Sequence, residues 1–372
     1  MVSVLLHIGQ PKTGTTAIQN ALLAQREQLI EHGTLYPTPK HIPYVHHFLP
    51  VLIEDPDKIA QHTLNRMGFD PMACKAMAQD ELALVRRQVD EARPRQIILS
   101  SESMFRNFSP AKFDHLKRIL AELGDEVRVV AYLRNPADHY MSRAQQQLRI
   151  RAEIVRPDPN RTIGPLTAYR AAFGEAFECR VYDRKTLTDG DVIRDFWDCA
   201  GLDPALMPPE TSGDNSSISA EAMSVFLRIN PPTDARTPDE AREHSRRRRA
   251  VLEADAELPG ATKPRLRPEV RDYIIRANTE LLQQRDEFGL VFPGIDYSVV
   301  GKGVPSQTPA FSRVEELCDL DPIRRDALEA KVRATLAPSW RKRLHKFVVR
   351  RSTAIGRSGS APVTAPPPAA NR

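Results

Sequence analysis

Cysteine is scarce in this chain, with 4 among 372 residues. The cysteines lie far apart and form neither a CxxC pattern nor a cluster with histidines. They stand at positions Cys74, Cys179, Cys199 and Cys318. This spacing argues against a disulfide framework and a zinc site, and no cluster of acidic residues suggests another metal centre. We therefore expect buried, reduced thiols and no bound metal.

Long apolar stretches are missing as well. No stretch reaches the roughly 18 apolar residues that a membrane-spanning helix needs. The short apolar run at the N-terminus also has no basic flank of the kind that a signal peptide carries. With 41% hydrophobic and 27% charged residues, the composition is typical of a soluble globular protein. We expect a cytoplasmic protein.

Acidic side chains are absent from residues 340–357, where seven basic ones gather. Removing those seven from the 53 basic residues leaves 46 against 48 acidic ones, so the net charge of +5 comes from this segment. The body of the protein is therefore not expected to bind nucleic acid. Residues 340–351 either lie on an anionic membrane surface or form a docked C-terminal helix.

Apolar runs alternate with helical periodicity in the first half of the chain. Such alternation predicts an α/β fold with a central parallel sheet flanked by helices. The predicted strands are residues 2–8, 95–101, 127–133 and 179–183, and the predicted helices are 15–33, 71–93, 110–123 and a helix that starts at 136. Residues 34–50 read as an ordered loop.

The second half is mainly helical. Its predicted helices are residues 189–200, 219–229, 237–256, 266–286 and 322–350. We expect one domain over residues 1–351, with a nucleotide-binding core at 1–185 and a helical portion at 186–351. Residues 352–372 are rich in alanine and proline, contain no aromatic residue and have the composition of a disordered tail.

A phosphate-type loop follows the first predicted strand. Its sequence, GQPKTGTT, starts at Gly9 and leads into a helix, where backbone N–H groups and the helix dipole attract an anion. A nucleotide-triphosphatase loop has the form GxxxxGK[ST], but here Thr15 occupies the lysine position and Lys12 precedes Gly14 by two residues. A lysine placed there can reach the bridging oxygen of a group that is being cleaved. The alternative is an ordinary turn with a surface lysine.

Two motifs carry a resemblance to a known family. HIGQPKTGTT resembles the 5′-phosphosulfate-binding loop of sulfotransferases that use 3′-phosphoadenosine 5′-phosphosulfate (PAPS). RNPADHYMS, which follows the strand at 127–133, is similar to that family's 3′-phosphate site through Arg134 and Ser142. The likeness covers residues 1–185 and, more loosely, segments up to 230 and at 277–289, and it is closer to bacterial carbohydrate-type members. It implies a P-loop-type sheet.

The resemblance also implies roles for these residues. Lys12 would stabilise charge on the bridging oxygen as the phosphate leaves. Arg134 and Ser142 would bind the 3′-phosphate, although a surface ion pair and a solvent-facing serine are the simpler alternatives. The 5′-phosphate would be held by donors of Thr13, Gly14, Thr15 and Thr16. The implied reaction moves a sulfuryl group from PAPS, without a metal, to a hydroxyl of a carbohydrate or a lipid-linked saccharide.

A general base must take the proton of the acceptor hydroxyl, and two candidates compete. Glu102 ends the strand at 95–101, where cytosolic sulfotransferases carry a Lys-Thr-His turn; here that turn reads Ser100-Ser101-Glu102. The rivals are His46 and His47 in the loop after the first helix, whose imidazoles have the better intrinsic pKa near neutrality. Glu102 is the favoured candidate. The alternatives are a carboxylate that caps a turn and histidines packed on aromatic rings.

Two other functions stay open at this stage. One is a P-loop nucleotide kinase, which the missing lysine after Gly14 and the absence of a credible Mg²⁺-binding aspartate weaken. The other is an inactive family member that only binds the nucleotide. Arg246 to Arg249 either line a groove for an acidic substrate or form a solvated face.

Overall fold

The computed structural model describes residues 1–337 except 60–62, 65–69, 160, 210–216 and 232–236. Residues 340–351, for which a membrane-surface segment and a docked helix are the alternatives, and the predicted tail therefore lie outside the described residues. Within the described part, all four cysteines are free thiols, and three of them are buried while Cys179 is partly exposed.

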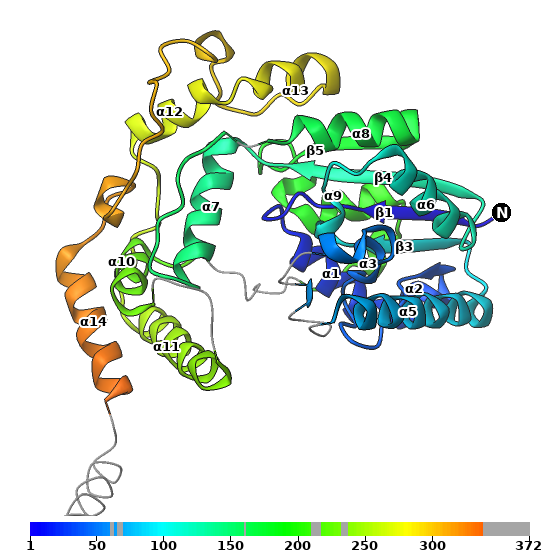
Figure 1. Ribbon diagram of the computed structural model, residues 1–372, viewed down its shortest axis with the longest axis horizontal. Helices are drawn as coiled ribbons and strands as arrows, with labels where there is room; N and C mark the ends of the chain where they lie inside the picture. The colour runs from blue at the N-terminus through cyan, green and yellow to red at the C-terminus, as the bar shows by residue number, and fades with distance from the viewer. Residues whose placement is uncertain (60–62, 65–69, 160, 210–216, 232–236, 338–372) are drawn as a thin grey trace, which may run out of the picture.

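A five-stranded parallel sheet forms the centre of one lobe (Figure 1). The strand order is β2-β3-β1-β4-β5, so β1 lies between β3 and β4. The strands are β1 (Ser3–His7), β2 (Thr34–Leu35), β3 (Gln96–Ser100), β4 (Glu126–Leu133) and β5 (Phe177–Val181). This architecture confirms the predicted fold class. The two-residue strand β2 was expected to be loop.

Helices cover both faces of the sheet because the strands are apolar on both sides. In β1, Val4 and Leu6 face one apolar cluster and Leu5 faces the other. The Leu5 face is covered by α1 (Thr15–Ala24), α2 (Arg26–Glu31) and α9 (Val192–Ala200). The opposite face is covered by α3 (Phe48–Ile53), α5 (Pro71–Ala92), α6 (Pro110–Ala121) and α8 (Ile163–Phe173). We call this sheet with its helices the α/β lobe.

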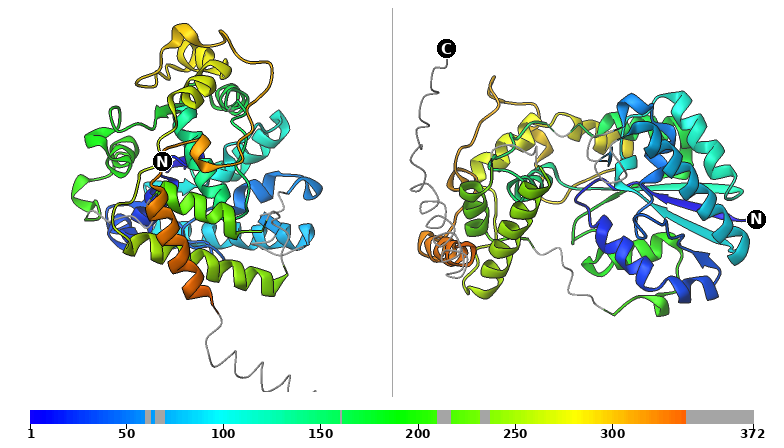
Figure 2. Two further views of the ribbon diagram at one scale, coloured as in Figure 1. Left: turned by 90° about the vertical axis from the view of Figure 1, so that its left-hand side faces the viewer. Right: turned by 60° about the horizontal axis from the view of Figure 1, so that its bottom comes forward.

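The remaining long helices form a second lobe beside the first (Figure 2). This helical lobe contains α7 (Pro136–Leu148), α10 (Ala220–Ile229), α11 (Pro238–Glu257), α12 (Pro268–Ala277) and α14 (Pro322–Leu336). Helix α13 (Glu280–Phe288) returns to pack on α8. The lobes therefore do not divide at residue 185, because α7 packs with α10 and α12 while α9 packs on α1.

Several predicted helices differ in their limits. The helix expected at 15–33 is broken at Gln25, and the helix expected at 266–286 is broken at Asn278. Helices α3 and α8 were not predicted. The other observed helices begin and end within three residues of the predicted limits, except α14, which was predicted to reach 350, beyond the described residues.

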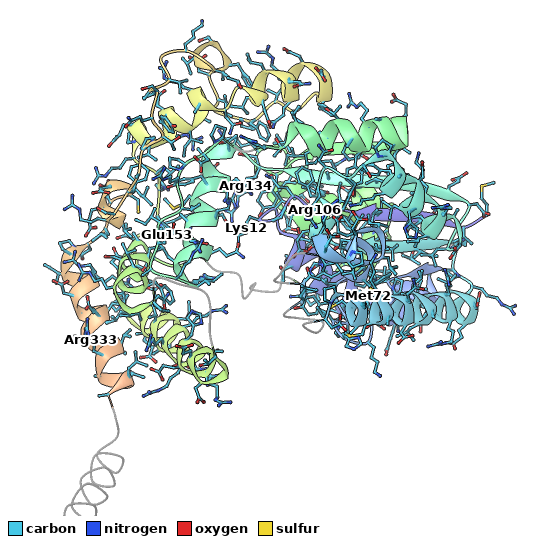
Figure 3. All side chains as sticks on the ribbon, in the orientation of Figure 1. Lys12, Met72, Arg106, Arg134, Glu153 and Arg333 are labelled. Carbon is cyan, nitrogen blue, oxygen red and sulfur yellow. The ribbon has the colours of Figure 1, made fainter. Side chains whose placement is uncertain are left out.

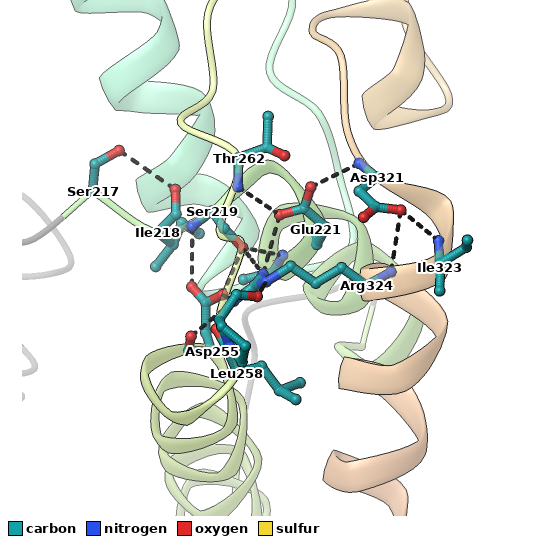
Figure 4. A network of polar contacts seen from close by, with 12 residues as sticks. Ser217, Ile218, Ser219, Glu221, Asp255, Leu258, Thr262, Asp321, Ile323 and Arg324 are labelled. Carbon is teal, nitrogen blue, oxygen red and sulfur yellow. Dashed lines mark hydrogen bonds and ion pairs between the residues drawn. The ribbon is translucent and has the colours of Figure 1, made fainter.

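A buried ionic network fixes α14 to α10 and α11 (Figure 4). The Arg324 guanidinium lies 3.1 Å from the Glu221 carboxylate and 2.9 Å from that of Asp255. It also donates hydrogen bonds to the backbone carbonyls of Leu258 and Pro259. Only 5% of the Arg324 side chain and none of the Glu221 side chain is exposed. These contacts satisfy both charges, which is the condition under which a buried ion pair is tolerated.

Candidate active site

The carboxyl ends of three neighbouring strands bring the predicted residues to one edge of the sheet. The loop from Gly9 to Gly14 follows β1, Glu102 follows β3, and Arg134 follows β4. After β1 the chain forms β2 and β3 on one side of this strand, and it then crosses over to form β4 and β5 on the other side. Ligands of open α/β sheets bind at such a switch point, outside the carboxyl ends of the strands.

The loop after β1 contains positive φ angles, which most residues other than glycine rarely adopt. Gly14 has φ +78°, and a Cβ atom there would lie 2.8 Å from Cγ1 of Val192, so only glycine fits. Lys12 adopts a positive φ of 73° although it is not a glycine. Such a conformation costs about 1 kcal/mol or more and is typical of functional loops.

An unpartnered hydroxyl lies where this loop becomes helix α1. Thr15 is the first residue of α1, it is 4% exposed, and its Oγ1 has no hydrogen-bond partner. The N-cap residue, Gly14, offers no side-chain oxygen to the first turn. An anion at this helix N-terminus would accept hydrogen bonds from the free hydroxyl and from the backbone N–H groups. The residues therefore fit the phosphate group that the sequence predicts.

Three of the residues predicted to bind the donor, Lys12, Arg134 and Ser142, line one cavity of about 810 Å³, whereas residues 13–16 do not line it. Arg134 Nη1 donates a hydrogen bond to the Lys12 carbonyl over 3.2 Å, and its guanidinium lies 5.4 Å from the centre of the Tyr182 ring. Figure 3 shows Lys12 and Arg134 close together between the two lobes. Ser142 comes from α7, which the side chain of Asn135 caps.

The cavity is strongly cationic. Seven basic and three acidic side chains line it, which gives a formal net charge of +4. The basic residues are Lys12, Arg134, Arg149, Arg184, Lys263, Arg265 and Arg271, and the acidic ones are Asp138, Asp183 and Asp191. Asp138 is 3.1 Å from Arg271, and Asp191 caps α9. Such a cavity is suited to a ligand with several negative charges.

Five of these cations were missed by sequence reasoning: Arg149, Arg184, Lys263, Arg265 and Arg271. Three of them come from the segment between α11 and α12 or from α12 itself, more than 110 residues after Ser142. Only tertiary packing brings them to the cavity. Arg149 carried a usable signal, because it follows Ser142 by seven residues and therefore lies on the same face of α7.

Burial and charged neighbours both shift the pKa of the Lys12 ammonium group. Burial lowers its pKa below the ordinary value, and Arg149 and Arg134 lower it further, while Glu102 opposes them. An anionic ligand beside Lys12 would favour the charged form again.

The two rival bases lie next to each other. The Nε2 atom of His47 is 3.8 Å from Oε1 of Glu102, and the His47 Nδ1 atom is 3.0 Å from the Ser101 hydroxyl. Gln19 of α1 donates from Nε2 to Glu102 Oε2 over 3.3 Å. Glu102 also abuts the loop, because a Cβ on Gly9 would lie 3.0 Å from the Glu102 Cβ. Glu102 and His47 thus form one pair beside the loop that carries Lys12.

His46 has a different environment from its neighbour. It is fully buried, its Nδ1 accepts a hydrogen bond from the Ser100 N–H over 2.9 Å, and its Nε2 donates to the Pro37 carbonyl over 2.9 Å. Burial lowers its pKa to about 4. Both ring nitrogens are engaged, so His46 cannot take a proton from an acceptor. Its expected role as a base is corrected to a structural one.

Thr13 and Thr16 are the other predicted phosphate-binding residues. The Thr13 hydroxyl is buried and donates to the Gln10 carbonyl, so the predicted donor at Thr13 is its backbone N–H group. Thr16 is exposed on the first turn of α1. Among the residues that the structure describes, no group of three or more His, Cys, Asp or Glu side chains is arranged to hold a metal ion. No helix in that part of the chain is long and apolar enough to cross a membrane.

Comparisons with known proteins assign no family to this chain. No protein-family model and no curated protein matches the chain. Two solved structures are similar. The sulfotransferase domain of the Synechococcus PCC 7002 olefin synthase is 16% identical, with a TM-score of 0.34, over 78% of this chain and 95% of that one. The sulfotransferase domain from the curacin biosynthetic pathway is 12% identical, with a TM-score of 0.32, over 79% and 99%. With TM-scores this low, neither similarity assigns a family or a function.

Proposed function

We propose that this chain is a sulfotransferase that moves a sulfuryl group from PAPS to an acceptor hydroxyl of a carbohydrate or a lipid-linked saccharide. One observation carries the proposal: Lys12, on the loop before α1, lines one cationic cavity together with Arg134 and Ser142. The acceptor class follows only from the resemblance in the sequence motifs.

The charge of the cavity matches the proposed donor. PAPS carries about four negative charges near neutral pH, two of them on the 3′-phosphate monoester. The cavity carries a formal +4. Arg134 and Ser142 would bind the 3′-phosphate, and the Thr15 hydroxyl with the backbone N–H groups of α1 would bind the 5′-phosphate. ATP lacks the 3′-phosphate and would leave Arg134 without its anion.

Sulfuryl transfer, like phosphoryl transfer, depends mainly on position and electrostatics. The S–O bond to the 5′-phosphate breaks while the acceptor oxygen bonds to sulfur from the opposite side. Lys12 lies on the loop itself and would stabilise the negative charge that develops on the departing bridging oxygen. Loss of one such preorganised donor costs a transition state about 2.7–4 kcal/mol, or a factor of about 100–1,000 in kcat.

The Glu102–His47 pair would accept the proton of the acceptor hydroxyl. Glu102 has a fixed orientation because Gln19 donates to one carboxylate oxygen and His47 lies beside the other. The Glu102 side chain is 31% exposed, so a substrate can reach it. The proton would move from the acceptor oxygen to Glu102, and the His47 ring lies 3.8 Å from that carboxylate.

Nucleotide binding tests the proposal most directly. We expect 3′-phosphoadenosine 5′-phosphate (PAP), the product left after transfer, to bind without Mg²⁺ and at least tenfold more tightly than ATP with Mg²⁺. Arg134→Gln should remove this preference. Tighter binding of ATP with Mg²⁺ would contradict the proposal and favour a nucleotide kinase.

Transfer of radioactive sulfate from PAPS tests catalysis. Lys12→Ala should lower kcat about 100- to 1,000-fold, and Glu102→Gln should abolish transfer to an acceptor while PAP still binds. His47→Ala should have a smaller effect. Tight PAP binding without transfer to any acceptor would indicate an inactive nucleotide-binding protein. Full activity of Glu102→Gln would exclude Glu102 as the base.

A further inference from the structure

The backbone of Lys12 is held by a hydrogen bond on each side. Lys12 has a φ of +73°, and its two torsion angles set the orientation of two peptide planes, one with the Pro11 carbonyl and one with the Lys12 carbonyl. His139 donates a hydrogen bond from Nε2 to the Pro11 carbonyl over 3.2 Å. Arg134 donates from Nη1 to the Lys12 carbonyl over 3.2 Å. Together the two bonds restrain both torsion angles of Lys12.

Both donors belong to one short segment with a well-defined backbone. Arg134 follows β4, and His139 is the fourth residue of α7. The Asn135 side chain caps this helix by accepting from the Ala137 N–H over 3.0 Å, and the His139 N–H donates to the Asn135 carbonyl over 2.8 Å. The His139 side chain is buried, with 6% of the residue exposed. The imidazole therefore contacts the phosphate loop from a packed helix.

A neutral imidazole is a suitable donor at this position. Burial, and to a smaller extent the positive charges of Arg143 and Arg134, lower the pKa of His139 to about 3. The ring is therefore uncharged near neutral pH, and its single N–H lies on Nε2, because that atom faces a carbonyl. An arginine or lysine in its place would add another positive charge beside Lys12 and Arg134.

The hydrogen bond from His139 and the strain at Lys12 are of similar size. One hydrogen bond in a folded protein contributes about as much free energy as a positive φ costs a residue other than glycine. Without the bond to the Pro11 carbonyl, a conformation of Lys12 with negative φ therefore competes with the observed one. A change of φ also changes the direction of the Cα–Cβ bond relative to the loop, and the ammonium group moves with it.

We propose that His139 is a positioning residue for sulfuryl transfer: its hydrogen bond to the Pro11 carbonyl holds Lys12 in the left-handed conformation that directs the ammonium group into the cavity. The inference rests on the proposed function for the role of Lys12. His139 itself is not among the described residues that line the cavity, so it acts on the reaction only through the loop.

Transfer from PAPS and binding of PAP test this role together. His139→Leu removes the donor and should lower kcat about tenfold or more, while the affinity for PAP changes less than threefold, because the proposed phosphate contacts are made by other groups. His139→Gln places an amide N–H within reach of the same carbonyl and should recover most of the activity. His139→Asn, whose amide is too short to reach it, should lose activity as His139→Leu does and replaces that variant if it does not fold.

Tyr140→Phe is the matched control. Tyr140 is the next residue of α7, is also buried, and donates from its hydroxyl to the Val155 carbonyl over 2.8 Å, which is not part of the phosphate loop. Its loss removes one hydrogen bond to a backbone carbonyl and should leave kcat within twofold. Equal losses of kcat in Tyr140→Phe and His139→Leu would show a general effect of destabilising α7 and would overturn the inference.

A double variant shows whether His139 acts through Lys12. In the Lys12→Ala background, His139→Leu should lower kcat less than twofold further, because the side chain that His139 positions is already absent. If the losses of the two single variants multiply in the double variant, His139 acts independently of Lys12 and the inference is wrong.

Crystal structures of the variants give a measurement that does not depend on transfer. We expect a negative φ at Lys12 in His139→Leu and the positive φ in Tyr140→Phe and His139→Gln. An unchanged positive φ in His139→Leu would overturn the inference even if the protein transfers sulfate. Failure of the unmodified chain to bind PAP would instead refute the proposed function, and the φ of Lys12 would still decide whether His139 holds the loop.

Discussion

Gln19 connects the phosphate loop to the proposed base through a single side chain. It lies in α1, is 1% exposed, and donates to both the Ser100 hydroxyl and the Glu102 carboxylate, over 3.1 and 3.3 Å. The Ser100 hydroxyl also lies 2.9 Å from Nδ1 of the buried His7. An amide with two N–H donors suits this position, because it orients a carboxylate without adding charge.

Replacing Gln19 should therefore change the pH dependence of transfer. Gln19→Glu places a second carboxylate beside Glu102, and repulsion between the two charges should move the acidic limb of the pH–kcat profile to higher pH. Gln19→Leu should lower kcat about tenfold or more with PAP affinity unchanged. Asn20→Asp, on the exposed side of α1, is the control. An unmoved profile in Gln19→Glu would show that Gln19 does not act on the base.

Deprotonation of Lys12 should limit the use of PAPS at alkaline pH. Its pKa is lowered by burial and by two neighbouring arginines, so the proton is lost at a lower pH than from an ordinary lysine with a pKa of about 10.4. We expect kcat/KM for PAPS to fall as pH rises through this lowered pKa. Lys12→Arg keeps its charge and should lose this alkaline limb. The same limb in both proteins would assign it to another group.

At the scale of single elements, the loop before α1 packs closely against α9. A Cβ on Gly14 would meet both an unfavourable backbone conformation and the Val192 side chain at 2.8 Å. Gly201, the C-cap of α9, shares the positive φ, but a Cβ there would have no atom within 4 Å. Substituting each glycine therefore distinguishes the free-energy cost of the backbone conformation from the cost of the contact with Val192.

We expect Gly201→Ala to lower the free energy of unfolding by about 1 kcal/mol. Gly14→Ala should lower it by about 2 kcal/mol or more, since overpacking adds to the backbone cost, and should abolish PAP binding. Shortening the neighbour in a Gly14→Ala, Val192→Ala double variant should restore part of the stability. Urea unfolding measures all three. Equal effects of the two glycine substitutions would contradict the contact.

The buried network at the start of α14 should be far more sensitive than the exposed pairs on the same helix. Arg324→Met leaves the Glu221 carboxylate buried without its partner and should lower the free energy of unfolding by about 3–5 kcal/mol. Arg333 pairs with Glu329 on the surface, and Arg333→Ala should cost about 0.5 kcal/mol or less. Similar losses of stability in both variants, measured by thermal unfolding, would show that the buried network of Arg324 contributes no more than an exposed ion pair.

At the scale of the whole molecule, three buried histidines make the fold sensitive to acid. Burial lowers the pKa of His7 and of His139 to about 3, and that of His46 to about 4. Each is less than a tenth exposed. In the unfolded chain these imidazoles have a pKa of about 6.5. The unfolded state therefore binds protons as the pH falls below about 6.5, while the folded state does not until the pH nears these lowered values.

Stability should accordingly fall from neutral pH to about pH 5.5, by roughly 1.3 kcal/mol for each histidine or about 4 kcal/mol in total. Urea unfolding followed by the fluorescence of the buried Trp197 measures the loss. His46→Asn should reduce the fall by about a third, whereas His32→Gln, at an exposed position, should leave it unchanged. A free energy of unfolding that is constant between these pH values would contradict the prediction that the three histidines are buried and neutral in the folded protein.

The sequence revealed the parts of this molecule that depend on local patterns. The apolar strands β1, β3, β4 and β5 stood out, and the polar residues that follow them had to meet at one edge of a parallel sheet. Strand β2 is two residues long and gave no periodic signal. The cations from the helical lobe could not be found, because packing alone brings Lys263 and Arg265 to the cavity. His46 and His47 are adjacent, so only their surroundings distinguish them.

The cavity draws its positive charge from both lobes: Lys12 and Arg134 come from the loops of the sheet, whereas Lys263 and Arg265 come from the helical side. A nucleotide bound there, as proposed, would contact both lobes, and its negative charges would offset the repulsion between their cations. We therefore expect bound PAP to raise the temperature at which the protein unfolds.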